Sequence, residues 1–258
     1  MKTYIVGNWK MNFTVGEASI YLHKLQKRIK SARNLEIVVA PSTIALQSLS
    51  LQLTRKNSKI RLAAQNIYQK DYGAYTGEIS VAQVKDLVKY AIIGHSERRY
   101  VFHETDKDIR QKVAAALRAG ITPILCVGET ENERTYNETA DVLKDQIYGG
   151  LSEVSREDIK KCIIAYEPVW AISGTSHAKL ATPDEVAGAV KLIKSELRSL
   201  YGEELTKEIP ILYGGSVSPS NAGAYLTVPG INGLLIGGAS LIADQFIDII
   251  EIAKKVTS

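Results

Sequence analysis

The chain has 258 residues, of which 45% are hydrophobic and 23% charged, an ordinary balance for a folded enzyme with a substantial core. Its net charge of +4 is small and its basic residues are scattered, which argues against nucleic acid or a membrane surface as a partner. A mildly basic protein instead favours a small anionic substrate. The sequence shows neither a signal-peptide pattern nor an apolar run of membrane-spanning length, and so predicts a cytoplasmic protein.

Eight short apolar runs recur along the chain, each followed by a helical pattern. We expect strands at Tyr4–Val6, Leu35–Ala40, Ile60–Ala64, Tyr90–Ile93, Thr122–Val127, Cys162–Tyr166, Ile209–Tyr213 and Leu234–Ile236. Since no linker or low-complexity segment interrupts the alternation, residues 1–258 are expected to form a single domain. Eight consecutive β/α units predict an α/β fold, a closed eight-stranded parallel (β/α)8 barrel surrounded by helices, with a doubly wound open sheet as the alternative.

Local signals mark several of the helices between these runs. Thr182-Pro183-Asp184-Glu185 combines an N-cap threonine, a proline at the first helical position and a glutamate at the capping-box position. Ser218-Pro219 is expected to start another helix, and Leu241, Phe246, Ile249 and Ile250 to belong to the last one. Cys126 and Cys162 fall inside apolar runs, which predicts buried thiols rather than a disulfide.

In a parallel barrel, functional residues follow the strands, where the carboxyl ends meet. Glu167 occupies such a position, and a carboxylate there is costly unless it is solvated, paired or used. A lone glutamate at a strand end is more often solvated, but the following residues combine a rigid proline, a large aromatic anchor and a small flexible tip. This favours Glu167 as a general base beneath a hinged lid. The predicted lid comprises Pro168, Val169, Trp170, Ala171, Ile172, Ser173, Gly174, Thr175 and Ser176.

Other strand ends carry further candidates. His95 is either structural or catalytic; if it caps a short helix, the helix dipole favours a neutral ring that donates a hydrogen bond. Lys10 could place positive charge where negative charge develops, or could be a surface lysine. Glycine pairs with small hydroxyl residues follow the last two strands and favour an anion such as phosphate. The histidines and cysteines lack metal-ligand spacing, so we expect no metal and no cofactor.

Five motifs, taken in order, resemble the triosephosphate isomerase family from Tyr4 to about Leu241. They are Asn8-Trp9-Lys10, Gly94-His95-Ser96-Glu97-Arg98-Arg99, Tyr166-Glu167-Pro168-Val169-Trp170-Ala171-Ile172, Tyr213-Gly214-Gly215-Ser216-Val217 and Gly237-Gly238-Ala239-Ser240-Leu241. The resemblance implies a proton transfer by Glu167 that interconverts glyceraldehyde 3-phosphate and dihydroxyacetone phosphate, while His95 polarises and reprotonates the enediolate oxygens. It also implies electrostatic stabilisation by Lys10 and Asn8, with Glu97 holding Lys10 or relaying its orientation. The implied phosphate-binding residues are Gly174, Ser216, Gly237 and Gly238.

The resemblance further implies a homodimer built on a long loop after the third strand. This loop runs from Gln65 to Glu78 and includes Tyr75, Thr76 and Gly77; Thr76 would brace the partner's Asn8 and Lys10.

The lid departs from the family pattern. Ser173 is interposed after Trp170-Ala171-Ile172, and the path to Thr182 is about three residues longer than is usual in the family. One alternative therefore stays open, an isomerase of a four-carbon substrate that converts L-erythrulose-1-phosphate to D-erythrulose-4-phosphate. Another is a catalytically silent barrel that binds sugar phosphates, which the joint presence of Glu167, His95 and Lys10 argues against.

Overall fold

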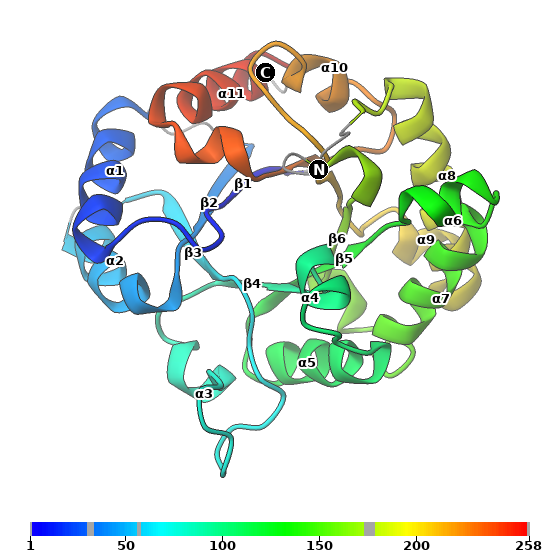
Figure 1. Ribbon diagram of the computed structural model, residues 1–258, viewed down its shortest axis with the longest axis horizontal. Coiled ribbons are helices and arrows are strands. Elements are labelled where there is room, and N and C mark those ends of the chain that lie inside the picture. Colours follow the sequence, from blue (N-terminus) through cyan, green and yellow to red (C-terminus); the bar gives the residue numbers. More distant parts are fainter. Residues whose placement is uncertain (1, 30–33, 56–57, 173–178, 257–258) are drawn as a thin grey trace.

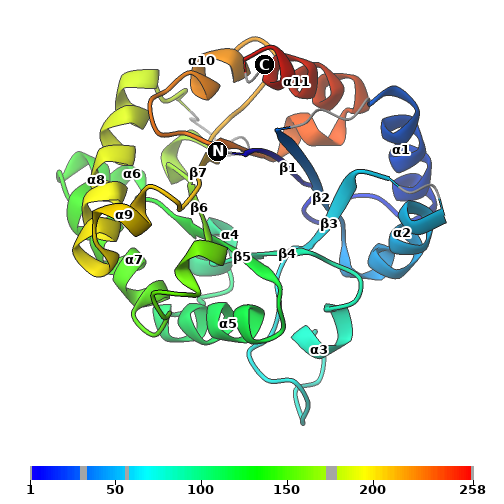
Figure 2. The same cartoon turned by 180° about the vertical axis from the view of Figure 1, so that it is seen from behind.

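The computed structural model describes residues 2–29, 34–55, 58–172 and 179–256. In it, eight parallel strands close into one barrel in chain order, because the first strand pairs with both the second and the eighth. The strands are β1 (Thr3–Asn8), β2 (Leu35–Ala40), β3 (Ile60–Ala64), β4 (Tyr90–Ile93), β5 (Thr122–Val127), β6 (Ile163–Tyr166), β7 (Ile211–Tyr213) and β8 (Gly233–Ile236). Figures 1 and 2 show the helices as a ring around this barrel. The predicted (β/α)8 barrel is confirmed, and the open sheet was the wrong alternative.

Helices connect successive strands and cover the outside of the barrel. They are α1 (Val15–Arg28), α2 (Thr43–Arg55), α3 (Val81–Val84), α4 (Ser96–Tyr100), α5 (Asp106–Arg118), α6 (Glu131–Thr135), α7 (Thr139–Leu151), α8 (Pro183–Tyr201), α9 (Glu203–Thr206), α10 (Ala222–Leu226) and α11 (Ala243–Val256), with short 3-10 turns η1 (Ile159–Lys161), η2 (Val169–Ala171) and η3 (Gly238–Leu241). Capping boxes start α1, α3, α5, α6 and α8, including the one predicted at Thr182 and Glu185. Much of the helix pattern is therefore fixed by local hydrogen bonds.

Some predicted boundaries were wrong by a few residues. Cys162 ends the turn η1 just before β6, and β7 begins after Pro210, which has no amide hydrogen to donate. The helix expected from Ser218-Pro219 begins only at Ala222, because residues 218–221 form a turn in which the Ser218 carbonyl accepts from the amides of Asn221 and Ala222. Leu241 lies in η3 rather than in the last helix.

The core has two layers. Side chains inside the barrel form a small cluster that includes Val6, Val38, Ile92, Cys126 and Leu212. A larger cluster fills the space between the strands and the helices and contains Cys162. Both cysteines are buried and free, as predicted. None of the helices in the described ranges is long and apolar enough to cross a membrane.

The amino-terminal end of the barrel contains a buried carboxylate, Glu36 of β2, whose side chain is only 8% exposed. Its oxygens accept a hydrogen bond from the Tyr90 hydroxyl (2.9 Å) and ion-pair with Lys2, while Lys89 lies 3.5 Å away and Arg61 3.9 Å away. Burial by itself raises the pKa of Glu36, but Lys2, Tyr90 and Lys89 outweigh it, so that its pKa lies below the ordinary 4.5. The ionised form is therefore favoured by folding.

We predict that Glu36→Gln lowers the free energy of unfolding by about 1–3 kcal/mol at pH 7, because it leaves a group of cations without its anion. A lowered pKa in the folded state contributes stability above the ordinary pKa, and this contribution is lost as the pH falls through the folded value. Urea unfolding at several pH values should thus show the difference from wild type shrinking below roughly pH 4. The same substitution at the exposed Glu157 is the control, and a difference that stays constant with pH would contradict the prediction.

Candidate active site

The carboxyl ends of the strands bring several of the predicted residues around one small cavity. Asn8, Lys10, His95 and Glu167 line it, together with Ile172, Leu235 and the glycines at 214, 215, 237 and 238. These residues are far apart in the sequence and meet only because the barrel closes.

The Glu167 carboxylate lies at the centre of this group and is almost fully buried, with 2% of the residue exposed. Its Oε2 accepts a hydrogen bond from the Ser96 amide at 3.0 Å, and its Oε1 lies 3.1 Å from His95 Nε2. Two donors thus offset the cost of removing a carboxylate from water. A buried carboxylate that is held by hydrogen bonds, which can break and re-form, is suited to proton transfer.

The imidazole of His95 is oriented by a short helix. His95 caps α4, and its Nδ1 accepts a hydrogen bond from the Glu97 amide at 3.2 Å. Because Nδ1 serves as an acceptor, the proton of a neutral ring is on Nε2, which faces Glu167. A neutral ring would therefore direct a donor toward the cavity, and the expected position of His95 as a helix cap is observed.

Lys10 is held above the cavity by three neighbours. Its ammonium lies 2.7 Å from Glu97 Oε1, its amide donates to Asn8 Oδ1 (3.1 Å), and its carbonyl accepts from Gln65 Nε2 (2.8 Å). Its backbone has a φ of 51°, an uncommon conformation for a residue with a side chain. The observed Lys10–Glu97 pair matches the arrangement that the family resemblance implied.

Two glycines leave room for Glu167. A methyl group at Gly128, at the end of β5, would stand 1.8 Å from the Glu167 carbonyl oxygen, and one at Gly214 would stand 2.8 Å from Glu167 Cγ. Real Cβ atoms do not approach other atoms so closely. The neighbouring strands β5 and β7 must therefore each be followed by a glycine for Glu167 to occupy its position.

The first part of the predicted lid is anchored firmly. Trp170 Nε1 donates to Glu129 Oε1 at 2.7 Å, and the Ala171 carbonyl accepts from the Ser216 amide at 2.9 Å. The guanidinium of Arg134 lies 4.2 Å from the Trp170 ring centroid and pairs with Glu185, so it connects the start of the lid to the helix that follows it. Ser173, Gly174, Thr175 and Ser176 lie outside the described residues.

Glu129 is a site residue that sequence reasoning missed. It is fully buried and also accepts hydrogen bonds from the Tyr166 hydroxyl at 3.0 and 3.2 Å. Burial raises the pKa of Glu129 in spite of these donors and of Arg134 nearby. The available signal was its place two residues after the fifth strand, close to the position that singled out Glu167 after the sixth.

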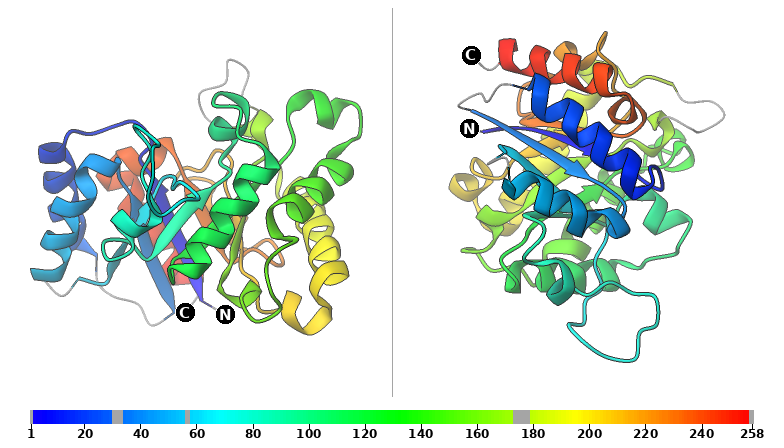
Figure 3. Two further views of the ribbon diagram at one scale, coloured as in Figure 1. Left: turned by 90° about the horizontal axis from the view of Figure 1, so that it is seen from below. Right: turned by 90° about the vertical axis from the view of Figure 1, so that its left-hand side faces the viewer.

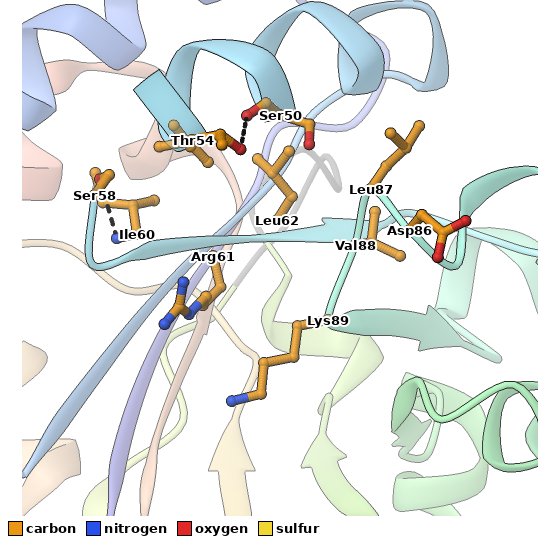
Figure 4. Close-up of a pocket in the computed structure, with 11 residues that line it drawn as sticks. Ser50, Thr54, Ser58, Ile60, Arg61, Leu62, Asp86, Leu87, Val88 and Lys89 are labelled. Carbon is orange, nitrogen blue, oxygen red and sulfur yellow. Dashed lines mark hydrogen bonds between the residues drawn. The ribbon is translucent and has the colours of Figure 1, made fainter. Parts of the chain in front are cut away.

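The cavities near the site differ in size and in character. The one around Glu167 measures only about 20 Å³, room for about one water molecule. It adjoins a cavity of about 330 Å³ that Asn8, Lys10, His95 and Glu97 share with the loop after β3. Figure 4 shows a third cavity, of about 400 Å³, at the amino-terminal ends of β3 and β4. The candidate catalytic residues do not line this third cavity, and in a barrel that end serves stability.

Metal binding has no support in the described ranges, where the structure brings no group of three or more histidine, cysteine, aspartate or glutamate residues together as a metal site. The candidate phosphate residues Gly237 and Gly238 line the same cavity as Glu167. Ser216 is adjacent in sequence to Gly215, which also lines it.

The barrel and the buried carboxylate, imidazole and lysine at its rim define a (β/α)8 enzyme with an acid–base site. The family model for triosephosphate isomerase matches residues 3–253. The chain is 42% identical over 254 residues to triosephosphate isomerase of Lactococcus lactis subsp. lactis and 44% identical over 254 residues to that of Geotalea uraniireducens, each match covering 98% of this chain and 99% of the relative. Triosephosphate isomerase of Chloroherpeton thalassium is 43% identical over 255 residues, with the same coverage. The chain belongs to the triosephosphate isomerase family.

Proposed function

We propose that this barrel interconverts glyceraldehyde 3-phosphate and dihydroxyacetone phosphate. The observation that carries the proposal is the contact of Glu167 Oε1 with His95 Nε2 at 3.1 Å, beside Lys10 and the glycines that follow β8. The site thus offers a base, a neutral donor and a positive charge around one small space, which is what proton transfer next to a carbonyl requires.

In the proposed reaction, the Glu167 carboxylate removes a proton from the carbon next to the carbonyl group. The electron pair of the C–H bond moves to form an enediolate, whose oxygens receive hydrogen bonds from His95 Nε2. The Lys10 ammonium stabilises the negative charge; Glu97 holds the ammonium, and Asn8 accepts from the backbone amide of Lys10. Through His95 Nε2 the former carbonyl oxygen gains a proton and the neighbouring hydroxyl oxygen gives one up, while Glu167 returns its proton to the former carbonyl carbon. The atoms then balance without a cofactor.

Substrate entry requires a rearrangement, because about 20 Å³ cannot hold a triose phosphate. Part of the space beside Gly214 is filled by Glu167 itself, which is tied to the Ser96 amide. We propose that Glu167 leaves Ser96 when substrate enters. The phosphate then lies against Ser216, Gly237 and Gly238, with Gly174 of the lid as the fourth contact.

The base assignment predicts that Glu167→Gln lowers kcat by roughly 10²-fold or more, because an amide cannot accept the proton. Phosphate affinity, measured by calorimetric titration with inorganic phosphate, should stay near the wild-type value. Glu208→Gln, at an exposed position far along the chain, provides the matched control. Turnover close to wild type in Glu167→Gln would remove this residue from the mechanism.

The three-carbon substrate is favoured over the four-carbon alternative, since the relatives described above are named for triose phosphate. We predict that kcat/KM for glyceraldehyde 3-phosphate exceeds that for L-erythrulose-1-phosphate in one enzyme preparation. A preference for the four-carbon sugar by about tenfold, equivalent to about 1.4 kcal/mol in transition-state free energy, would reverse the assignment. A wild-type enzyme inactive on both substrates would favour the binding-only barrel.

We propose that the protein is a homodimer formed through the loop after β3. The chain leaves the barrel at Tyr68 and returns at Ile79, whose carbonyl accepts from the Tyr68 amide at 2.8 Å, and between them it extends away from the barrel (Figures 1 and 3). In this loop, Tyr72 is 84% exposed, and Thr76 is exposed too.

The cavity of about 330 Å³ beside Lys10 has an apolar rim. Met11 and Phe102, which are 97% and 61% exposed, line it. The partner's loop is a suitable occupant for this apolar rim.

Sedimentation at micromolar concentration should therefore give about twice the chain mass of 28.3 kDa. Thr76→Glu should weaken the dimer and lower activity together. The added carboxylate would enter the other subunit's cavity, where the negative charge of Glu97 would repel it. Thr54→Glu, at an exposed position on α2, makes the same chemical change away from this loop and should alter neither. A wild-type protein that sediments only as a monomer would refute the proposal.

We also propose a cytoplasmic location. Two free, buried cysteines are typical of a protein that folds in a reducing compartment.

A further inference from the structure

An aromatic cluster lies beneath the loop that carries Lys10. The Trp9 ring makes edge contacts with Phe13 (centroids 5.1 Å apart) and with Tyr21 of α1 (4.8 Å). Trp9 is fully buried, and Tyr21 is only 6% exposed. The ring of Tyr21 thus supports the end of β1, and its hydroxyl group points beyond the cluster.

That hydroxyl donates a hydrogen bond of 2.5 Å to the carbonyl of Ser240, which lies in η3, after the last strand of the barrel. Burial, with a smaller contribution from Asp244, raises the pKa of Tyr21, which keeps its phenol protonated and able to donate. Figure 1 shows α1 beside α11, and the chain passes through η3 just before α11 begins. A side chain from the first helix therefore reaches the backbone that follows the last strand.

Ser240 is in turn linked to the glycines of the candidate phosphate site. Both its amide (2.8 Å) and its Oγ (2.7 Å) donate to the Gly237 carbonyl, and its side chain is fully buried. A methyl group on Gly237 would stand 3.8 Å from Lys10 Nζ, so this backbone passes directly beside the catalytic lysine. Any shift of Ser240 would thus be transmitted to Gly237 and Gly238.

We propose that Tyr21 is a positioning residue for phosphate binding: by holding the Ser240 carbonyl, its hydroxyl fixes the backbone of residues 237–240 in the orientation that receives the substrate's phosphate group. This inference rests on the proposed function of the same site. Tyr21 does not line the cavity around Glu167 and acts only through Ser240. The hydroxyl, rather than the ring, carries the role, because the ring contacts end at Trp9 and Phe13.

The test removes this hydroxyl alone, with Tyr21→Phe. We expect the Kd for inorganic phosphate, measured by calorimetry, to rise roughly fivefold, because an unpaired buried carbonyl lets the loop shift. The value of kcat/KM for glyceraldehyde 3-phosphate should fall by a similar factor. For D-glyceraldehyde, which lacks the phosphate, kcat/KM should stay unchanged, and a merely structural loss would lower both values.

Tyr201→Phe supplies a matched control. Tyr201 is 4% exposed and its hydroxyl also donates to a backbone carbonyl, that of Leu151 at 2.7 Å, on the far end of α8 from the lid. Its thermal unfolding midpoint should fall about as much as that of Tyr21→Phe, while its phosphate Kd should stay at the wild-type value.

The outcomes separate this inference from the proposed function. Equal phosphate Kd values for wild type and Tyr21→Phe, or equal losses on the phosphorylated and unphosphorylated substrates, would overturn the positioning role. A wild-type enzyme that binds phosphate but does not isomerise the triose phosphates would overturn the proposed function. The positioning role of Tyr21 would then still be decided by the phosphate titration, because that measurement needs no turnover.

Discussion

A carboxylate withdrawn from water governs the arrangement of this barrel's rim. Glu167 needs donors to remain buried, and it finds them in the Ser96 amide and in His95. Both donors come from the start of α4, which His95 caps. Gly214 must lack a side chain because Glu167 Cγ lies beside it, and Gly128 because the Glu167 carbonyl group does. The base and its donors thus follow from one electrostatic requirement, and the two glycines follow from close packing around the same residue.

Much of this organisation could be read from the sequence, because it depends on local patterns. Apolar runs separated by helical patterns indicate the strands, and capping residues such as Thr182 indicate where helices start. His95 and Glu167 are identified by their positions after strands. Boundaries failed by a few residues where a missing amide hydrogen or a turn separates the expected signal from the element, as at Pro210 and at residues 218–221. Residue spacing alone does not show how long such a turn is.

Apart from the Lys10–Glu97 pair, which the family resemblance implied, contacts that join distant elements were not predicted from the sequence. The bond from Tyr21 to Ser240 depends on how α1 lies against the chain after β8, and that placement follows only from closure of the barrel. Glu129 was missed for a related reason. Its partners Tyr166 and Trp170 lie on the next β/α unit, and nothing in the residues around it indicates burial. Sequence motifs thus identify the chemical groups better than the residues that hold them in place.

Closure also has a consequence for how the chain folds. Seven of the eight strand pairings join strands that are neighbours in sequence, whereas β1 and β8 pair across nearly the whole chain, Tyr4 opposite Gly233. Long-range pairings are kinetically slow, because loop entropy is lost before any contact is gained. Until β1 and β8 pair, both strands have free hydrogen-bonding edges that can recruit other chains. An open seam between β1 and β8 thus exposes a newly made molecule to aggregation, and closing it removes both edges.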